Sequence, residues 1–444
     1  MLNPFARGGQ REGLPIHPGA FPLVGHIPAI YYRLPEVLRR AQAELGPLYW
    51  VAAGFGWVLF CSGPEAVDVL RNRAFDSAHL EKLAPAIASG TMLARDGAPH
   101  RHLRGALAGP FLPRGLTASG VGATIAVALG EVAARWVGQG SARVLPDAQD
   151  AALDIIFRLI GVAPAELPTW RDKYRALVLA NLGITARFPG SPATRSDAAK
   201  IWINAGMRAL IADARRAPAS AGLLGALIAA QDDDGAALTD AELVDNLRLL
   251  VLGGHESISA TIAWMTVTLG HRPELWDALV AEAGDAEAIP TTPAAAKQFP
   301  FAEALFRETV RLHPPFAFIT RTAAEDTTLY GQRVARGTVL GVDLWSAAHD
   351  AATFPEPDAF LPSRWLGRTG SPSPLEIAQF GAGPHFCLGY HLAWLEAVEF
   401  AVALAREGKR LGRRPRLRSK ELPRSIYLPT EHPPARTWVD FVRG

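Results

Sequence analysis

Cysteine is scarce in this sequence, which has only Cys61 and Cys387 among its 444 residues. Zinc sites and iron–sulfur clusters take several protein ligands, so one lone cysteine suits neither of them. The ordinary interpretation of a free cysteine is a small buried apolar side chain. Cys61 fits it, because the residue ends the apolar, strand-like run Trp57-Val-Leu-Phe-Cys61.

Long apolar runs are missing as well. No segment offers about 18 uninterrupted apolar residues, the length that spans a bilayer. The N-terminus lacks the apolar stretch of a signal peptide. Residues 121–130 form the most apolar stretch, but it is rich in Gly and Ala and runs into Glu131, which predicts a buried helix. We expect a cytoplasmic protein without a membrane anchor.

Charge of one sign is not in excess: 45 Lys and Arg oppose 43 Asp and Glu, for a net charge of +2. This balance gives no argument for nucleic acid as a partner. The chain has no internal repeat or low-complexity linker, and 49% of its residues are hydrophobic. We therefore predict one large domain over residues 31–444, preceded by an irregular, Pro/Gly-rich arm over residues 1–30.

Apolar spacing predicts a mainly α fold with small β-sheets. Two β-rich runs, Leu48–Ala53 and Gly56–Cys61, predict a hairpin, and Thr328–Trp345 predicts a second β region. Elsewhere the spacing is mostly helical. The sheets should therefore be minor parts of a helical protein.

The clearest helix begins at the capping box Thr239–Glu242 and runs to Gly270. About 30 residues at about 1.5 Å each give roughly 45 Å, enough to cross a domain of this size. Gly253 and Gly254 lie in its middle, where each glycine costs up to about 1 kcal/mol relative to alanine. Close approach of a flat cofactor is a sufficient reason to omit two side chains there.

Cys387 lies in the run Phe380-Gly-Ala-Gly-Pro-His-Phe-Cys387-Leu-Gly-Tyr-His-Leu-Ala393. Glycines on both sides would let the backbone curl around the sulfur and offer N–H groups to a thiolate. Zinc is a weaker alternative, since His385 and His391 do not have a usual ligand spacing relative to the cysteine. A single thiolate suits one axial bond to a haem iron.

This run resembles the cysteine-ligand loop of the cytochromes P-450 at each fixed position: Phe380, Gly383, His385, Cys387 and Gly389. The resemblance implies the fold of that family, in which a long central helix crosses a buried haem b. It also implies that Cys387 is the axial ligand of the iron. A disulfide with Cys61 would destroy such a site, so the chain should occupy a reducing compartment.

The mid-helix segment Gly253-Gly-His-Glu256-Ser257 resembles the oxygen-binding segment of the same family. The resemblance implies that Gly253 lies against the haem and that Glu256 and Ser257 are the catalytic acid and alcohol that deliver protons. The ordinary alternatives are a solvated glutamate and a serine bonded back to the carbonyl of Gly253. The chain departs from the family here, since serine replaces the usual threonine and Ile258 the second one, which puts tight coupling in doubt.

Two further motifs carry the resemblance into the second half of the chain. Glu308-Thr-Val-Arg311 resembles the family's Glu-x-x-Arg helix, and Arg364 lies in a segment that supplies a second arginine. The resemblance implies a buried charge network that holds the cysteine loop. An exposed i,i+3 pair alone would contribute only a few tenths of a kcal/mol.

The haem propionates need cationic or hydrogen-bonding partners. His100 and Arg104 resemble the family's His-x-x-x-Arg helix, and Arg321 resembles its propionate arginine. His385 fills the remaining position. Each of these residues alone would be interpreted as a surface charge, and it is the set that indicates a haem.

The implied reaction inserts one oxygen atom from O2 into a lipophilic small molecule by hydroxylation or epoxidation, as in terpenoid or polyketide tailoring of secondary metabolism. Electrons would come from a ferredoxin or flavodoxin with its reductase, because the sequence has no flavin or iron–sulfur segment. The candidate substrate pocket is apolar or aromatic: Leu249, Leu250, Phe316, Phe318, Ile426 and Tyr427.

Two other functions keep the same cysteine loop. A peroxygenase or a haem-thiolate enzyme that does not use oxygen would be expected to lack the acid–alcohol pair Glu256 and Ser257. A haem sensor or electron carrier would need neither a proton relay nor a large apolar pocket. The presence of the pair therefore favours a monooxygenase.

Overall fold

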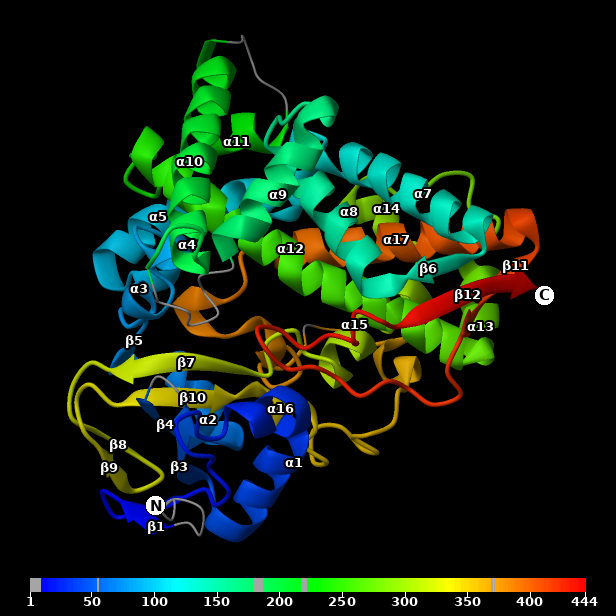
Figure 1. Ribbon diagram of the computed structural model, residues 1–444. Helices are drawn as coiled ribbons and strands as arrows, with labels where there is room; N and C mark the ends of the chain where they lie inside the picture. Colours follow the sequence, from blue (N-terminus) through cyan, green and yellow to red (C-terminus); the bar gives the residue numbers. More distant parts are fainter. Residues whose placement is uncertain (1–8, 54–55, 179–186, 217–221, 369, 371) are drawn as a thin grey trace. The chain divides into compact units, whose positions relative to one another are not determined.

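The structure is a computed structural model that describes residues 9–53, 56–178, 187–216, 222–368, 370 and 372–444 (Figure 1). Its contacts divide the chain into two compact units, each assembled from separated segments. Unit 1 comprises Met1–His79, Arg307–Cys387 and Arg424–Pro434, and unit 2 comprises Leu80–Phe306, Leu388–Pro423 and Ala435–Gly444. The single domain over residues 31–444 stays a prediction.

Unit 1 contains a seven-stranded sheet with the strand order β1-β2-β3-β4-β10-β7-β5. Its strands are β1 Gly9–Arg11, β2 Leu14–Ile16, β3 Leu48–Ala53, β4 Gly56–Cys61, β5 Phe75–Asp76, β7 Phe318–Ala323 and β10 Val339–Asp343. β3 pairs antiparallel with β4 from Leu48↔Cys61 to Ala53↔Gly56, which confirms the predicted hairpin strands. β10 runs parallel to β4, so segments some 280 residues apart in sequence meet in one sheet.

The second predicted β region ends earlier than expected. It forms β8 Thr327–Leu329, β9 Gln332–Val334 and β10, but Leu344–Ala348 is the helix α16. The side chain of Asp343 accepts a hydrogen bond from the N–H of Ser346 at 2.8 Å and so caps that helix. The prediction of β structure to Trp345 was wrong because this cap ends the strand.

The N-terminal arm contains some regular structure. β1 and β2 lie within the residues 1–30 that were predicted to be irregular, joined over Glu12 and Gly13, both at positive φ. The helix α1 Ile27–Leu45 begins before residue 30, with Pro28 in its first turn. A second helix of this unit, α2 Pro64–Val69, follows β4 in the sequence.

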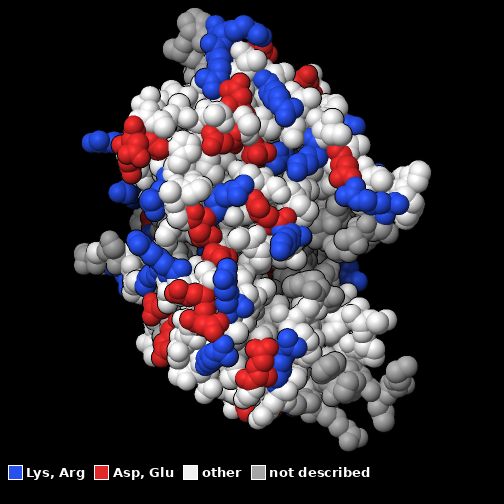
Figure 2. All heavy atoms as spheres, turned by 90° about the vertical axis from the view of Figure 1, so that its left-hand side faces the viewer, with Lys and Arg blue, Asp and Glu red and all other residues white. Residues whose placement is uncertain are grey.

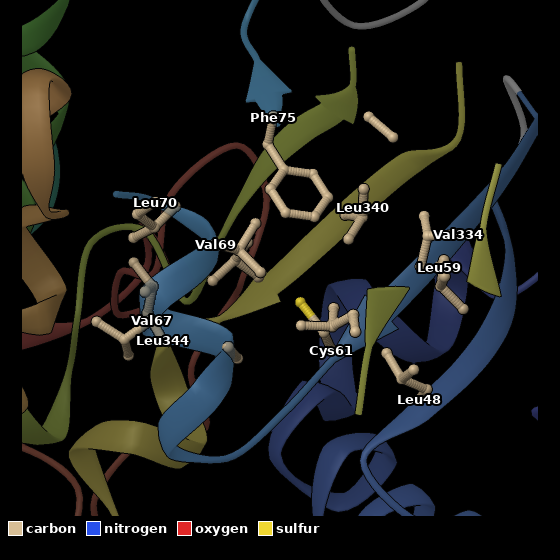
Figure 3. Close-up of a cluster of buried hydrophobic side chains, with 14 of the residues drawn as sticks. Leu48, Leu59, Cys61, Val67, Val69, Leu70, Phe75, Val334, Leu340 and Leu344 are labelled. Carbon is tan, nitrogen blue, oxygen red and sulfur yellow. The ribbon is translucent and has the colours of Figure 1, made fainter. Parts of the chain in front are cut away.

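Cys61 lies in the main hydrophobic core of unit 1, among Leu48, Leu59, Phe75 and Leu340 (Figure 3). Its side chain is fully buried, and burial raises the pKa of its thiol. A buried, protonated thiol is a poor ligand and a poor nucleophile. The prediction that Cys61 fills the core is confirmed.

Unit 2 is built mainly of helices. They are α3 Leu80–Leu83, α4 Pro85–Ala88, α5 Gly97–Phe111, α6 Pro113–Ser119, α7 Val121–Gln139, α8 Val144–Leu159, α9 Leu167–Val178, α10 Pro192–Arg216, α11 Leu223–Ala229, α12 Asp240–His271, α13 Pro273–Ala283, α14 Pro293–Ala296 and α17 Tyr390–Leu411. α15, Pro300–Leu312, begins in this unit and ends in unit 1. A three-stranded sheet with the order β11 Arg413–Leu417, β12 Trp438–Arg443, β6 Ser141–Arg143 completes it.

The long helix α12 is confirmed (Figure 1). It has 32 residues, and its capping box is formed as predicted: the hydroxyl of Thr239 accepts from the N–H of Glu242, whose carboxylate accepts from the N–H of Thr239. α12 packs along α8, and every residue from Ile258 to Gly270 is buried. Such burial explains why the helix is apolar around much of its circumference.

Two segments, Val121–Gln139 and Gly383–Leu411, are long and apolar enough to cross a membrane by length and composition alone. Of their apolar windows, 56% and 67% are buried inside the protein, as in core helices. The first segment is α7, which contains the predicted buried helix at 121–130. On the face that Figure 2 presents, basic and acidic side chains are interspersed, in keeping with the near-neutral net charge.

Gly270 allows α12 to approach β11 closely, and we predict that Gly270→Ala destabilises the protein. An added Cβ would lie 2.8 Å from the backbone nitrogen of Leu417 and 3.3 Å from the carbonyl carbon of Arg416. Backbone cannot move aside as a side-chain tip can, so the expected cost is roughly 1–3 kcal/mol. Urea unfolding followed by circular dichroism should show a lower midpoint.

Gly138→Ala on α7 is the matched control, because its Cβ meets nothing within 4 Å. This control should be neutral or gain up to about 1 kcal/mol from helix propensity. Equal midpoints for the two variants would contradict the proposed close contact.

Candidate active site

The loop that carries Cys387 is held by its own backbone in unit 1. Two 3₁₀ turns, Ala378–Phe380 and Gly383–His385, precede the cysteine. The N–H of Cys387 donates to the carbonyl of Phe380 at 2.8 Å, and the N–H of Phe386 donates to that of Gly383 at 3.1 Å. The loop therefore closes on itself, and the cysteine is half-buried and not in a disulfide.

Glycine occupies its positions in this loop for different structural reasons. Gly383 has φ +63°, and a Cβ there would lie 2.8 Å from the carbonyl oxygen of Leu70 and 3.0 Å from the Cα of Arg71. Gly381, which the motif comparison did not single out, has φ +77° and needs glycine for its conformation. A Cβ at Gly389 would meet nothing within 4 Å, and the residue is the N-cap of α17, a position where glycine is common. Its assignment to the haem stays a prediction.

Glu308 and Arg311 form a buried ion pair on α15. Their side chains are 0% and 1% exposed, and the arginine donates to both carboxylate oxygens, Nε to Oε2 at 2.9 Å and Nη2 to Oε1 at 2.7 Å. Arg364 donates to the same carboxylate from its Nε at 3.1 Å. The three residues that the motifs indicated are therefore in contact.

Two further donors complete this network, and no motif indicated them. The indole of Trp365 donates to Oε2 of Glu308 at 2.8 Å, and the N–H of Leu361 donates to Oε1 at 2.9 Å. Arg311 in turn donates to the carbonyls of Ala348, Pro357 and Ala359. The network thus holds the segment that runs toward the Cys387 loop onto α15.

The other predicted residues of unit 1 lie on its strands and turns. Arg321, on β7, is 4% exposed, and its Nη1 donates to the carbonyl of Thr320 at 2.9 Å. His385 is half-buried at the end of its 3₁₀ turn. The assignment of both residues to the haem stays a prediction.

The four pocket candidates of unit 1 fall into two classes. Phe318 and Tyr427 pack against the second apolar core of the unit. These two side chains therefore stabilise the fold of unit 1, in addition to any contact with a ligand. Phe316 is 42% exposed, an uncommon state for an aromatic ring among the described residues. Ile426 is half-buried, and its N–H donates to the carbonyl of His432 at 2.9 Å.

In unit 2, the two adjacent glycines of α12, Gly253 and Gly254, also differ in what surrounds them. A Cβ on Gly254 would lie 3.4 Å from Cδ1 of Ile156, so that glycine serves the packing of α12 on α8. A Cβ on Gly253 would meet no described atom within 4 Å, and the residue is exposed. Helix packing therefore explains Gly254 but not Gly253, which leaves room for a bound group beside it.

Glu256 and Ser257, the predicted acid and alcohol, come shortly after these glycines on α12. Ser257 donates its hydroxyl hydrogen to the carbonyl of Gly253 at 2.7 Å, so its oxygen is left to accept. The side chain of Glu256 is 15% exposed, and burial raises the pKa of its carboxyl. Of the two ordinary alternatives, the bonded-back serine is present, but the solvated glutamate is not.

Sequence reasoning gave no role to His255, which precedes Glu256. Nδ1 of His255 lies 3.4 Å from Oε1 of Glu256, and among the described residues no arginine or lysine pairs with this carboxyl.

Elsewhere in unit 2, His100 is buried and Arg104 half-buried on α5. Their spacing of four residues places them on one helix face, while their assignment to propionates stays a prediction.

Leu249 and Leu250 precede the acid on α12. Leu250 is buried, with 9% of its surface exposed, and Leu249 is half-buried. Helix spacing separates neighbours by about 100°, so the two leucines lie on different faces of α12. Their part in a substrate pocket stays a prediction.

The residues present fit a haem with a thiolate ligand. Cys387 is a half-buried residue, whereas Cys61 is fully buried. In the described ranges, no group of three or more His, Cys, Asp or Glu side chains could hold a bare metal ion. The open space beside Gly253 suits a flat group, and the cationic candidates suit its propionates.

Comparison with known proteins gives the same result. A family model described as "Cytochrome P450" matches residues 173–405. The "Cytochrome P450 BJ-4 homolog" of Sinorhizobium fredii (strain NBRC 101917 / NGR234) is 42% identical over 443 residues, 99% of either chain. "Cytochrome P450 BJ-4" of Bradyrhizobium diazoefficiens is 41% identical over the same share of both chains.

A more distant relative and a solved structure extend the comparison. The "Cyclooctat-9-en-7-ol 5-monooxygenase" of Streptomyces melanosporofaciens is 28% identical over 408 residues, 87% of each chain. The structure "Retinoic acid bound cyanobacterial CYP120A1" superposes with a TM-score of 0.82 over 97% of this chain and 99% of that one. At 22% identity, this likeness concerns the fold and confirms its predicted class.

We predict that Glu308→Gln destabilises the protein strongly. The amide carries no charge and brings two N–H donors of its own, so Arg311 and Arg364 lose their counter-ion while they stay buried. Breaking a buried ion pair in this way costs about 3–5 kcal/mol. Thermal unfolding should show a lower midpoint, and haem content per chain should fall.

Glu303→Gln provides the comparison, because Glu303 lies in the first turn of the same helix and outside this network. It removes one carboxylate from α15 and should lower the free energy of unfolding by less than about 1 kcal/mol, with a correspondingly small change in the midpoint. A loss as large as that of Glu308→Gln would show that the network is not the cause.

Proposed function

The chain belongs to the cytochrome P450 family, and from that premise we propose that it inserts one oxygen atom from O2 into a lipophilic small molecule, by hydroxylation or epoxidation. It is a haem-thiolate monooxygenase. The observation that carries the assignment in this chain is the closed loop around Cys387, with its half-buried cysteine and its glycine at φ +63°. Secondary metabolism, such as terpenoid or polyketide tailoring, is the proposed context.

Bound haem b supplies the activation of oxygen, and the chain supplies its placement and the protons. Cys387 would ligate the iron from the loop of unit 1, and Arg321, His385, His100 and Arg104 would hold the propionates. Phe380 keeps the loop closed through its carbonyl, which accepts a hydrogen bond from the N–H of Cys387. Gly383 keeps it closed through its positive φ. Gly389 and Gly253 would leave space for the macrocycle.

Proton delivery would use Glu256 and Ser257. A carboxyl with a raised pKa holds its proton nearer to neutral pH and is a better donor there than a solvated one. The serine hydroxyl already donates to the carbonyl of Gly253, so its oxygen can accept a proton from one side while it passes its own to the other. Without the methyl of threonine its rotamer is less fixed.

The substrate class rests on apolar side chains and on one relative. The candidate pocket residues Leu249, Leu250 and Phe316 carry no polar group, and Phe316 is 42% exposed. The relative at 28% identity is named as a 5-monooxygenase of an unsaturated alcohol, cyclooctat-9-en-7-ol. We infer a lipophilic substrate of terpenoid type and a cytoplasmic enzyme without a membrane anchor.

A titration of the ferric holoprotein tests the substrate class. Terpenoid hydrocarbons and alcohols, fatty acids and macrolactones would be added separately while the Soret band is recorded. We expect terpenoids to shift the band toward the high-spin form, because a ligand beside Gly253 displaces water from the iron. A shift with fatty acids alone would contradict the proposed class, and no Soret band after reconstitution would contradict the haem itself.

The electron source separates the candidate functions. We expect the compound with the largest Soret shift to be oxygenated when NADPH, a ferredoxin or flavodoxin and the matching reductase are supplied. Omitting the carrier protein should abolish product. Product formed with hydrogen peroxide alone, at a rate no lower than with the carriers, would instead identify a peroxygenase. Reduction without product from any compound would favour a sensor or electron carrier.

A further inference from the structure

A buried polar cluster lies beside Glu256, where His255 of α12 meets Tyr174 of α9. His255 is 5% exposed, and its ring meets that of Tyr174 edge-on, with centroids 6.2 Å apart at 81°. Tyr174 is 0% exposed and also meets Phe157 of α8 edge-on, at 6.1 Å. Both aromatic residues therefore lie in the core of unit 2.

Neither polar group of this cluster is hydrogen-bonded to protein. The hydroxyl of Tyr174 has no such partner, and Nδ1 of His255 lies 3.4 Å from Oε1 of Glu256 without forming a hydrogen bond to it. A buried polar group left unpaired costs about 1–3 kcal/mol, and nearly all such groups are satisfied by protein or by internal water. Phenylalanine and leucine would fill the same space without this cost, so packing alone does not account for the tyrosine and the histidine.

Tyr174 lies close enough to both Glu256 and Arg248 for their charges to affect its pKa. Burial raises the pKa of Tyr174, the charge of Glu256 raises it further, and Arg248 opposes both. Burial, with the charge of Arg175 adding to it, lowers the pKa of His255 to about 3, so its ring is neutral at physiological pH. A neutral imidazole can accept a hydrogen bond at one nitrogen and donate at the other.

Arg248, whose charge acts on Tyr174, has a buried Nε without a hydrogen-bond partner in the protein, and its other end pairs with the half-buried Asp245. This arginine is 1% exposed; its Nη1 donates to Oδ1 of Asn204 at 2.9 Å and lies 2.8 Å from Oδ1 of Asp245. Asp245 is 33% exposed. Lys200 of α10 lies close enough for Arg248 and Asp245 to affect its pKa, which is lowered chiefly by burial.

We propose that Tyr174 and His255 hold a chain of internal waters that returns a proton to Glu256 from the solvent side at Asp245. The inference rests on the proposed role of Glu256 as the proton source. Both residues act through Glu256 and are positioning residues, since neither touches the reacting oxygen.

The proton balance leaves no charge behind. Glu256 gives its proton toward Ser257 and becomes a carboxylate. The water nearest to it, held by Tyr174 and His255, gives a proton to that carboxylate and takes one from the next water outward. The last proton comes from solvent near Asp245, so the phenol, the imidazole and the waters end neutral while Arg248 stays charged throughout.

The first test follows the carboxyl of Glu256 in the holoenzyme by infrared difference spectroscopy. Its C=O band, assigned by its loss in Glu256→Gln, is titrated with pH. In Tyr174→Phe we expect the band to shift and its titration midpoint to rise, because the carboxylate loses a water-mediated hydrogen bond that favours the charged form. An unchanged band and midpoint would overturn the inference.

Tyr49→Phe is the matched control. Tyr49 lies on β3 in unit 1, is 0% exposed, and loses the same single hydroxyl from a buried ring. It should leave the Glu256 band and midpoint as in the wild type. His255→Gln is the second variant, which keeps the test decisive if Tyr174→Phe loads poorly with haem.

The second test measures proton delivery without an organic substrate. Holoenzyme reduced with dithionite and freed of excess reductant is mixed first with oxygenated buffer and then with reduced ferredoxin, which supplies the second electron, and the return of the ferric Soret band is timed in H2O and D2O. Tyr174→Phe should slow the return by up to about 10²-fold, the lower limit for a direct proton donor, and raise the H2O/D2O rate ratio. Tyr49→Phe should change neither.

A double variant separates this inference from the proposed function. In the Glu256→Gln background, Tyr174→Phe should cause no further slowing, because both changes interrupt one path. Full additivity would show that Tyr174 acts independently of Glu256 and would overturn the inference. If Glu256→Gln alone changed nothing, the proposed role of Glu256 would fail; if it slowed the return and Tyr174→Phe did not, only the inference would fail.

Discussion

The buried carboxylate of Glu308 is the constraint that ties the segment from Leu361 to Trp365 onto α15. It accepts five hydrogen bonds, from Arg311, Arg364, Trp365 and the N–H of Leu361. A charge taken out of water is tolerable only when its partners are complete. Here the partners come from two segments separated by about fifty residues, so satisfying one charge also fixes the segment that leads to Cys387.

Glycine sets how closely backbone can approach in each of the two units, but for different reasons. Gly383 combines a positive φ with close contact to Leu70 and Arg71, whereas Gly254 makes room for Ile156 of α8. Gly253, one residue earlier, has no protein neighbour to avoid. Of these adjacent glycines, Gly254 allows α12 to pack on α8, and Gly253 leaves space beside the helix. The sequence alone does not distinguish these two roles.

Burial, rather than ion pairing, controls the acid of α12. Desolvation alone raises the pKa of Glu256, and the same burial keeps the neighbouring His255 neutral. An arginine in this place would hold the carboxyl ionised. The neutral surroundings of Glu256 instead favour a carboxyl that can give up a proton and recover it, which unites the proposed function with the role inferred for Tyr174.

The sequence by itself determined the family, the capping box of α12, the strands β3 and β4, and the charge triad of Glu308, because each depends on residue types at short spacing. Spacing could not reveal where Asp343 ends β10, that Trp365 completes the carboxylate shell, or that Tyr174 meets His255. Those outcomes were decided by the tertiary structure, since each needs a hydrogen bond or a buried contact between elements that local sequence does not connect. Whether a glutamate is solvated or buried depends on what packs around its helix, and that is a property of the folded chain.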